Sequence, residues 1–249
     1  MSQAIVSAIE HYETLLADHY TWMSGGFAAK VAVQLALFNR LGVRPDVTSL
    51  AVDLGCGPGF QTLALEQLGF AVTSVDANAQ MLGELDEHAK GKEIRTVQHD
   101  LAHLGTCSVL PAQADYAVCM GDTLIHLPSQ EAVLDLFEQM HRILMPGGCL
   151  ILGFRDLSQE LVGVDRFIPV RSDDERVMTC FLEYEEEDRV IVTDLIYQRQ
   201  EDGWKLLKSA YRKLRLSPAW VRAQLETRGF VIRSEETVLG VSILVAQRS

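Results

Sequence analysis

The stretch "VDLGCGPGF", residues 52–60, decides the fold of this chain. An apolar run leads into it, three glycines alternate with other residues, and a helical pattern follows. Glycines between a strand and a helix let the backbone turn sharply and approach a ligand without Cβ clashes. The spacing alone is a weak signal, because ordinary strand-to-helix turns also use glycine and Phe60 stands at the sixth position of the G-x-G-x-x-G pattern. The stretch predicts a strand–loop–helix unit and a candidate nucleotide cradle.

Short apolar segments alternate with helical patterns on both sides of this loop. The predicted strands lie at residues 50–54, 71–76, 94–100, 114–120 and 149–154. Helical patterns fill the intervals, and we expect Ser129 to open the last helix and Pro146–Gly148 to end it. A β-α-β-α order with short buried strands predicts an α/β fold, with a parallel sheet and helices on both faces.

The pattern changes after residue 172. Three consecutive strands are predicted at 176–187, 189–200 and 205–216, with Asp202–Gly203 as a hairpin turn. No helix separates them, so they predict an antiparallel β insertion after the fifth strand. A helix from Pro218 and a hairpin around Gly240 follow. We expect four parts: a helical cap at 1–48 whose first helix Ser2 would cap, an α/β core at 49–156, the insertion at 157–216, and a helix and β-hairpin at 217–249 that complete the core.

The bulk properties narrow the class of protein. Of the 249 residues, 48% are hydrophobic, and the formal net charge is −12. A negative surface repels phosphate backbones, so we do not expect nucleic acid as the main partner. No apolar stretch approaches the roughly 20 residues of a membrane span, and the start shows no secretory signal. Five scattered cysteines without a C-x-x-C pair suit reduced thiols. We expect a cytoplasmic protein with a small-molecule partner and no membrane contact, for which a homo-oligomer is an open option.

Two acids follow the glycine loop at the ends of predicted strands. Asp76 comes about 20 residues after the loop, where a carboxylate accepts both ribose hydroxyls of a nucleotide. Asp100 ends the third strand, where an adenine edge would lie. No lysine follows the glycines and Asp53 precedes them, so a phosphate ligand is disfavoured. S-adenosylmethionine carries an ammonium and a sulfonium but no phosphate, and this charge pattern favours it over NAD.

From about Ser49 to Phe154 the chain resembles the class I S-adenosylmethionine-dependent methyltransferases. The elements that carry the resemblance are "VDLGCGPG", Asp76, "HDL" at 99–101 and "PGG" at 146–148. The resemblance implies a Rossmann-like seven-stranded sheet whose last strand is antiparallel. It also implies that the loop glycines contact the methionine part of the donor, Asp76 the ribose, and Asp100 with Leu101 the adenine. The expected donor-binding residues are Tyr20, Asp53, Gly55, Cys56, Gly57, Gly59, Asp76, Ala77, Asp100, Leu101, Met120 and Gly121.

The end of the fourth strand, "CMGDTLIHL" at 119–127, is expected to face the methyl group, because open α/β sheets bind ligands outside the carboxyl ends of their strands. Asp122 is a candidate to hold a cationic or hydroxyl group of the acceptor. His126 is a candidate proton acceptor, and the alternative is a structural histidine that caps or underlies the loop. Tyr20, next to a pair of glycines, is a candidate to enclose the sulfonium by cation–π attraction.

The chain is similar to the glycine and sarcosine N-methyltransferases in three places: the segment 119–127, "LILGFRDL" at 150–157, and the strand-rich insertion. The similarity implies that Arg155 binds the carboxylate of the acceptor. A structural salt bridge of Arg155 with Asp156 or Asp122 is the alternative. That group has an amide where this chain has Asp122. An acid there favours a protonated amine, yet a methyl acceptor must be neutral when it attacks.

The sequence thus favours an S-adenosylmethionine-dependent methyltransferase that modifies a small polar acceptor, with an amine or amino-acid-like nitrogen methylated by in-line displacement. Its candidate catalytic residues are His126, Asp122 and Arg155. The rivals are an NAD-dependent oxidoreductase, against which Phe60 and Asp53 argue, and a non-catalytic S-adenosylmethionine-binding module. His99 and His103 are too few ligands for a metal, so no metal site is expected.

Overall fold

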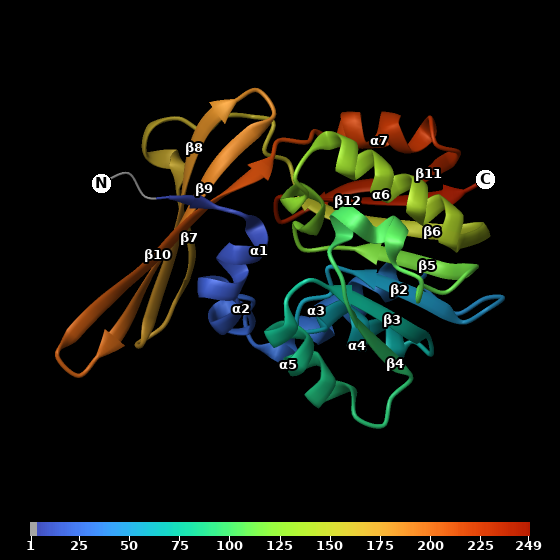
Figure 1. The fold of residues 1–249 in the computed structure, drawn as a ribbon, viewed down its shortest axis with the longest axis horizontal. Helices are drawn as coiled ribbons and strands as arrows, with labels where there is room; N and C mark the ends of the chain where they lie inside the picture. The colour runs from blue at the N-terminus through green and yellow to red at the C-terminus, as the bar shows by residue number, and fades with distance from the viewer. Residues whose placement is uncertain (1–3) are drawn as a thin grey trace.

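Two β-sheets lie on opposite sides of an N-terminal helical segment in this computed structural model (Figure 1). The structure describes residues 4–249, and residue 186 by its backbone only. Ser2, the expected cap of the first helix, lies outside the described residues. No helix within residues 4–249 combines the length and the apolar character that a membrane crossing requires.

The first sheet has seven strands in the order β11-β12-β6-β5-β2-β3-β4. Neighbouring strands are parallel except at the β11–β12 end, where β12 runs antiparallel to both neighbours. The predicted α/β sheet with an antiparallel last strand is therefore confirmed. Its strands are β2 (Leu50–Leu54), β3 (Ala71–Asp76), β4 (Ile94–Gln98), β5 (Ala114–Cys119), β6 (Leu144–Arg155), β11 (Phe230–Val238) and β12 (Val241–Arg248).

Helices cover both faces of this sheet, as predicted. Apolar side chains of α6 (Gln130–Ile143) and α7 (Pro218–Glu226) pack on one face. Those of α3 (Phe27–Arg40) and α4 (Phe60–Gln67) pack on the other, and α5 (Ala79–Ala89) joins α4. Side-chain caps set three of the helix starts: Asn78 accepts from Met81 N, Ser129 from Ala132 N, and Ser217 from Trp220 N.

One boundary differs from the prediction. Helix α6 ends at Ile143 and β6 begins at Leu144, so Pro146–Gly148 lie inside the strand and do not end the helix. Leu144 pairs with Ala114, and a register shift follows before the next pair of the two strands. Gly148 permits this close approach, because a Cβ there would lie 2.9 Å from the carbonyl oxygen of Ala114.

The second sheet forms between β6 and α7, where the sequence predicts an antiparallel insertion. Its order is β1-β10-β9-β8-β7, and β7 to β10 pair antiparallel. The three predicted strands are β8 (Arg176–Glu186), β9 (Arg189–Gln200) and β10 (Gly203–Leu214), and two further strands flank them: β7 (Phe167–Ser172) and β1 (Ile5–Val6). Ile5 was expected in a helix, but it pairs in parallel with Ala210 at the sheet edge, and the helix begins only at Ala8 after its cap Ser7.

The N-terminal segment continues through α1 (Ala8–His11), a π-helical turn η1 (Tyr12–Leu16) and α2 (Ala17–Met23). Leu15 and Leu16 pack against Met178 and Ile196 of the second sheet. The pair Gly25–Gly26, with φ of 98° and 95°, then redirects the chain into α3. The segment is thus bound to the second sheet while α3 belongs to the first.

Candidate active site

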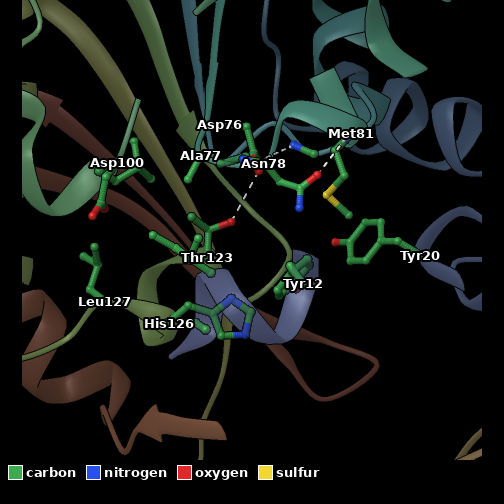
Figure 2. Close-up of a pocket in the computed structure, with 15 residues that line it drawn as sticks. Tyr12, Tyr20, Asp76, Ala77, Asn78, Met81, Asp100, Thr123, His126 and Leu127 are labelled. Atoms are coloured by element: carbon green, nitrogen blue, oxygen red, sulfur yellow. Dashed lines mark hydrogen bonds between the residues drawn. The ribbon is translucent and has the colours of Figure 1, made fainter. Parts of the chain in front are cut away.

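A cleft opens at the carboxyl ends of β2, β3, β4 and β5, and the N-terminal segment forms its opposite wall (Figure 2). It contains about 680 Å³ of space free of atoms, which includes space open to solvent. The residues that line it are Ala8, Ile9, Tyr12, Tyr20, Gly55, Gly57, Asp76, Ala77, Asn78, Met81, Asp100, Leu101, Thr123, His126 and Leu127.

The glycine loop forms one side of the cleft, as predicted. Gly55 and Gly57 have φ of 66° and 53°, in the left-handed region that favours glycine. A Cβ on Gly55 would lie 2.2 Å from Cγ2 of Thr123, so the loop and the end of β5 touch there without room for a side chain. The amides of Gly55 and Cys56 donate to the carbonyl of Val75, at 2.8 and 3.0 Å, which fixes the loop to β3.

Both strand-end acids reach the cleft. Asp76 accepts hydrogen bonds from the amides of Gly57 and Asn78, each at 2.8 Å. Burial raises the pKa of Asp76, and these hydrogen bonds oppose that rise. Asp100 accepts from the amide of Ala102 at 2.9 Å and precedes Leu101, which also lines the cleft. The register of the parallel sheet thus brings two distant carboxylates to one edge.

Aromatic side chains of the N-terminal segment close the cleft. The ring of Tyr20 stacks on Phe60 with 6.1 Å between centroids, and Tyr12 lies 5.9 Å from Tyr20. Burial raises the pKa of both tyrosines well above the ordinary value, so both hydroxyls stay protonated. Figure 2 shows Tyr20 beside Met81 and Tyr12 beside His126. Tyr20 was expected here from the sequence and Tyr12 was not.

Five of the residues expected at the donor are not among those that line the cleft: Asp53, Cys56, Gly59, Met120 and Gly121. The side chain of Asp53 points to α4, where Thr62 Oγ1 donates to it at 2.6 Å, and burial raises the pKa of Asp53 to about 7. Cys56 packs among Phe60, Leu63, Leu82 and Leu85, and burial raises the pKa of its thiol. Gly59 is the N-cap of α4, Met120 packs against Gly153, and Gly121 faces the hydroxyl of Tyr20.

Asp122 is also not among the lining residues and is held by two cations. It has a φ of 74° and accepts from the amide of Arg155 at 2.9 Å. Its Oδ2 lies 2.5 Å from Nη1 of Arg155 and 2.9 Å from Nζ of Lys213. Burial by itself raises the pKa of Asp122, but Lys213 and Arg155 outweigh it and hold that pKa well below the usual range. The ion pair of Arg155 with Asp122 is one of the two alternatives that the sequence leaves open.

His126 lines the cleft beside Tyr12. It is half-buried, its ring lies 5.6 Å from those of Tyr12 and Tyr211, and its buried Nε2 has no hydrogen-bond partner among the described residues. Burial, and after it the charge of Lys213, lower the pKa of His126 to about 3. An imidazole with this pKa is neutral at pH 7 and is a weak base, so it is better suited to accept a hydrogen bond than a proton.

Sequence reasoning missed Lys213, Tyr12, Asn78 and Met81. Asn78 carries a local signal, because it stands before α5 as an N-cap residue. Lys213 and Tyr12 carry none, because their positions depend on how the second sheet and the N-terminal segment pack.

Within residues 4–249 no group of His, Cys, Asp and Glu side chains is arranged to hold a metal ion. Nε2 of His99 lies 3.0 Å from the backbone oxygen of His103.

Comparison with known proteins gives matches over the core. A family model described as a methyltransferase domain matches residues 51–148. A glycine/sarcosine N-methyltransferase of Aphanothece halophytica is 31% identical over 107 residues, which are 42% of this chain and 40% of the relative. A ubiquinone biosynthesis O-methyltransferase of Methylococcus capsulatus is 28% identical over 111 residues, or 45% and 44% of the two chains. The match thus spans about two fifths of the length of these relatives.

Solved structures match over almost the whole length. The CcbJ methyltransferase of Streptomyces caelestis superposes with a TM-score of 0.77 at 20% identity and covers 96% of this chain and 98% of its own. An amino pentose methyltransferase of Micromonospora echinaspora, solved with S-adenosylmethionine bound, gives a TM-score of 0.71 at 15% identity over 100% of both chains. The domain match places residues 51–148 in the methyltransferase domain family, and the whole chain shares its fold with solved S-adenosylmethionine-dependent methyltransferases.

Proposed function

We propose that this protein transfers a methyl group from S-adenosylmethionine to an amine nitrogen of a small-molecule acceptor. One observation carries the proposal: a single cleft brings the glycine loop, Asp76 and Asp100 together on one side, and the neutral side chains of His126, Tyr12 and Tyr20 on the other. The first side suits an adenosine and the second suits a neutral acceptor next to a cationic sulfur.

The residues present fit this donor. Asp76 would accept the ribose hydroxyls, Asp100 and Leu101 would border the adenine, and the backbone at Gly55 and Gly57 would meet the methionine part. The faces of Tyr12 and Tyr20 would attract a sulfonium. The described residues that line the cleft include no lysine and no arginine. A pyrophosphate would therefore meet two carboxylates and no cation, which argues against NAD.

The reaction needs little chemistry from the protein. S-adenosylmethionine supplies a methyl group on a positively charged sulfur; as the acceptor nitrogen forms its bond to that carbon, the carbon–sulfur bond breaks, its electron pair stays on sulfur and the positive charge moves to nitrogen, which then loses a proton. The task of this chain is to hold both reactants in line and to exclude water. The half-buried rings of Tyr12 and Tyr20, which line the cleft, serve both tasks.

The state of His126 favours nitrogen over oxygen as the methylated atom. A hydroxyl acceptor must lose its proton before or during attack, and this demands a competent base. A neutral amine attacks with its lone pair and needs none. Because the pKa of His126 is lowered to about 3, the cleft offers a hydrogen-bond acceptor and no strong base. The glycine/sarcosine N-methyltransferase relative, whose name gives nitrogen as the methylated atom, is consistent with this choice.

Two measurements test the proposal. Calorimetry should show binding of S-adenosylmethionine but not of NAD, and Asp76→Asn should weaken the former about tenfold or more, as expected for a lost charge-assisted hydrogen bond. A screen with methyl-labelled donor against small amines, amino acids and phenols should then label an amine. Donor binding without labelling of any acceptor would favour a non-catalytic binding module, and labelling of phenols alone would overturn the assignment to nitrogen.

A further inference from the structure

Three charged side chains meet behind the wall beside His126, and their charges do not cancel. Asp122 supplies one negative charge, and Arg155 and Lys213 supply two positive charges. The side chains of Asp122 and Lys213 are 4% and 11% exposed, whereas that of Arg155 is 59% exposed. The chain as a whole carries a formal charge of −12. A locally positive cluster is therefore a specific feature of this wall.

We propose that Lys213 is an electrostatic positioning residue: together with Arg155 it overcompensates Asp122, and the resulting positive wall keeps an amine acceptor in its neutral, nucleophilic form. This inference rests on the proposed function and names the form in which that site takes its acceptor. It also narrows the acceptor class to amines that can bind uncharged, and excludes permanent cations such as quaternary ammonium compounds.

The geometry makes Lys213 the decisive member. Arg155 ends β6 and contacts Asp122 through both its backbone amide and its guanidinium, so these two residues form a neutral pair within the first sheet. Lys213 reaches Asp122 from β10 of the second sheet, at 2.9 Å. It is the added charge that turns a neutral pair into a positive cluster. Since Lys213 and Asp122 are shielded from water, solvent screens this charge less than it would at the surface.

His126 reports the effect of the cluster inside the cleft. The charge of Lys213 is the largest charge effect on its imidazole and disfavours the protonated form, in the same direction as burial. Other charged or titratable groups face His126 from the elements packed around it: Asp122 and Arg155 of the first sheet, His11 of α1, Tyr12 of η1 and Tyr211 of β10. Only Asp122 among the charged groups acts in favour of protonation.

An acceptor amine bound beside His126 would lie on the side of the cleft that faces this cluster, opposite Asp76 and Asp100. A protonated amine would place a second cation next to the sulfonium and the positive wall, whereas a neutral amine adds none. The transfer itself creates no charge, because the positive charge only moves from sulfur to nitrogen. The wall therefore opposes the unreactive ammonium more than the reacting pair. A carboxylate at position 122 is compatible with this role, because Arg155 and Lys213 compensate its charge.

The first test needs no acceptor. Histidine-labelled protein is titrated by NMR between about pH 4 and pH 8, and His126 is assigned by its loss in His126→Gln. Lys213→Met should raise the midpoint of His126 by about one to three pH units, whereas Asp122→Asn should lower it or leave it below the range. Lys205 is another lysine of β10, and its side chain is exposed. Lys205→Met should leave the titration midpoint of His126 unchanged. Asparagine tolerates the left-handed φ of position 122, so that variant adds no backbone strain there.

The second test uses the best amine found in the labelled-donor screen. The acidic limb of the pH profile of kcat, which reports the protonation of groups in the enzyme–acceptor complex, should move to higher pH in Lys213→Met and to lower pH in Asp122→Asn. Donor affinity measured by calorimetry should be unchanged. Opposite shifts mark a charge effect, because a purely structural disturbance would move both variants the same way or neither. Unchanged titration of His126 and an unchanged limb in Lys213→Met would overturn the inference. A protein without turnover but with the shifted His126 midpoint would overturn the proposed function alone.

Discussion

His11 and Asp194 join the N-terminal segment to the second sheet, with 2.9 Å between Nε2 and Oδ2 and both side chains buried. Cys180 Sγ donates to the other oxygen of Asp194 at 2.7 Å, and the ring of His11 stacks on Tyr211 with 4.0 Å between centroids. The segment fastened in this way supplies Ala8, Ile9, Tyr12 and Tyr20 to the cleft. The wall of the cleft thus depends on a contact outside it.

Breaking this contact should destabilise the protein. Asp194→Ala leaves a buried imidazole without its hydrogen-bond partner, and an unsatisfied buried polar group costs about 1–3 kcal/mol. Asp194→Asn keeps a hydrogen-bond acceptor in place and should cost less. Urea unfolding measures both, with the exposed Glu201→Ala as a control that should match wild type. Equal stability of Asp194→Ala and wild type would show that the contact does not hold the segment.

A methyl group added at Gly55 should abolish donor binding. Its Cβ would lie 2.2 Å from Cγ2 of Thr123, and the φ of 66° is one that side-chain-bearing residues seldom adopt. Such strain costs roughly 1–3 kcal/mol, and the loop must also shift away from Thr123. Gly55→Ala is therefore expected to lose S-adenosylmethionine binding in calorimetry.

Gly83→Ala is the matched control for this change. Gly83 lies inside α5, and nothing stands within 4 Å of the position where its Cβ would be. Alanine in a helix interior is more favourable than glycine by roughly 0.5–1 kcal/mol, so this variant should be slightly more stable than wild type and bind the donor normally. Normal donor binding by both variants would contradict a role of the loop in the site.

The residues that the sequence placed correctly share a local cause. The carboxyl ends of parallel strands meet at one edge of a sheet, so Asp76 and Asp100 reach the same cleft as the loop that contains Gly55. The hairpin between β9 and β10 forms where Asp202–Gly203 predicts it, but its two-residue turn is Glu201–Asp202, because Gly203 already pairs with Gln200. Pattern and turn chemistry suffice for features of this kind.

The residues that were missed depend on packing between distant segments. Lys213 reaches Asp122 only because the second sheet lies against the end of β5, and no spacing in the sequence encodes that approach. Tyr12 lines the cleft because β1 and His11 bind the N-terminal segment to the second sheet. Asp53 shows a further limit: strand side chains alternate between faces, and at this position the carboxylate faces Thr62 of α4 and not the ligand edge.

Asp53 should make the stability of the protein depend on pH. Burial raises the pKa of Asp53 to about 7, while the unfolded chain titrates near the ordinary value of about 3.9. Between these values the folded state keeps a proton that the unfolded state has released, so this group lowers stability as pH rises from about 4 to about 7. Asparagine stays neutral and can still accept the hydrogen bond of Thr62.

The stability of Asp53→Asn relative to wild type is therefore expected to increase as the pH rises. The difference in the free energy of unfolding should grow by about 1.4 kcal/mol for each pH unit inside the window and stay constant above it. Urea unfolding at a series of pH values between about 4 and 8 gives this difference directly. Parallel profiles of the two proteins would show that Asp53 is ionised when folded.

Arg155 offers a test of the two roles that the sequence left open. Its Nη1 is engaged by Asp122, yet more than half of the side chain is exposed, and the described residues provide no partner for Nε and Nη2. This edge of the guanidinium suits bidentate binding of a carboxylate, which lysine cannot reproduce. Arg155→Lys preserves the charge beside Asp122, so it separates carboxylate binding from support of the cluster.

We expect Arg155→Lys to lower kcat/KM more for an amino acid acceptor than for the corresponding amine without the carboxylate. The expected difference is about ten- to hundredfold, because hydrogen bonds to charged groups contribute about 1.5–3 kcal/mol. The pair of acceptors is compared in wild type and variant with the same labelled donor. The difference should appear mainly in KM, because a carboxylate distant from the reacting nitrogen contributes equally before and during transfer. An equal loss for both acceptors would leave Arg155 with the single role of compensating Asp122.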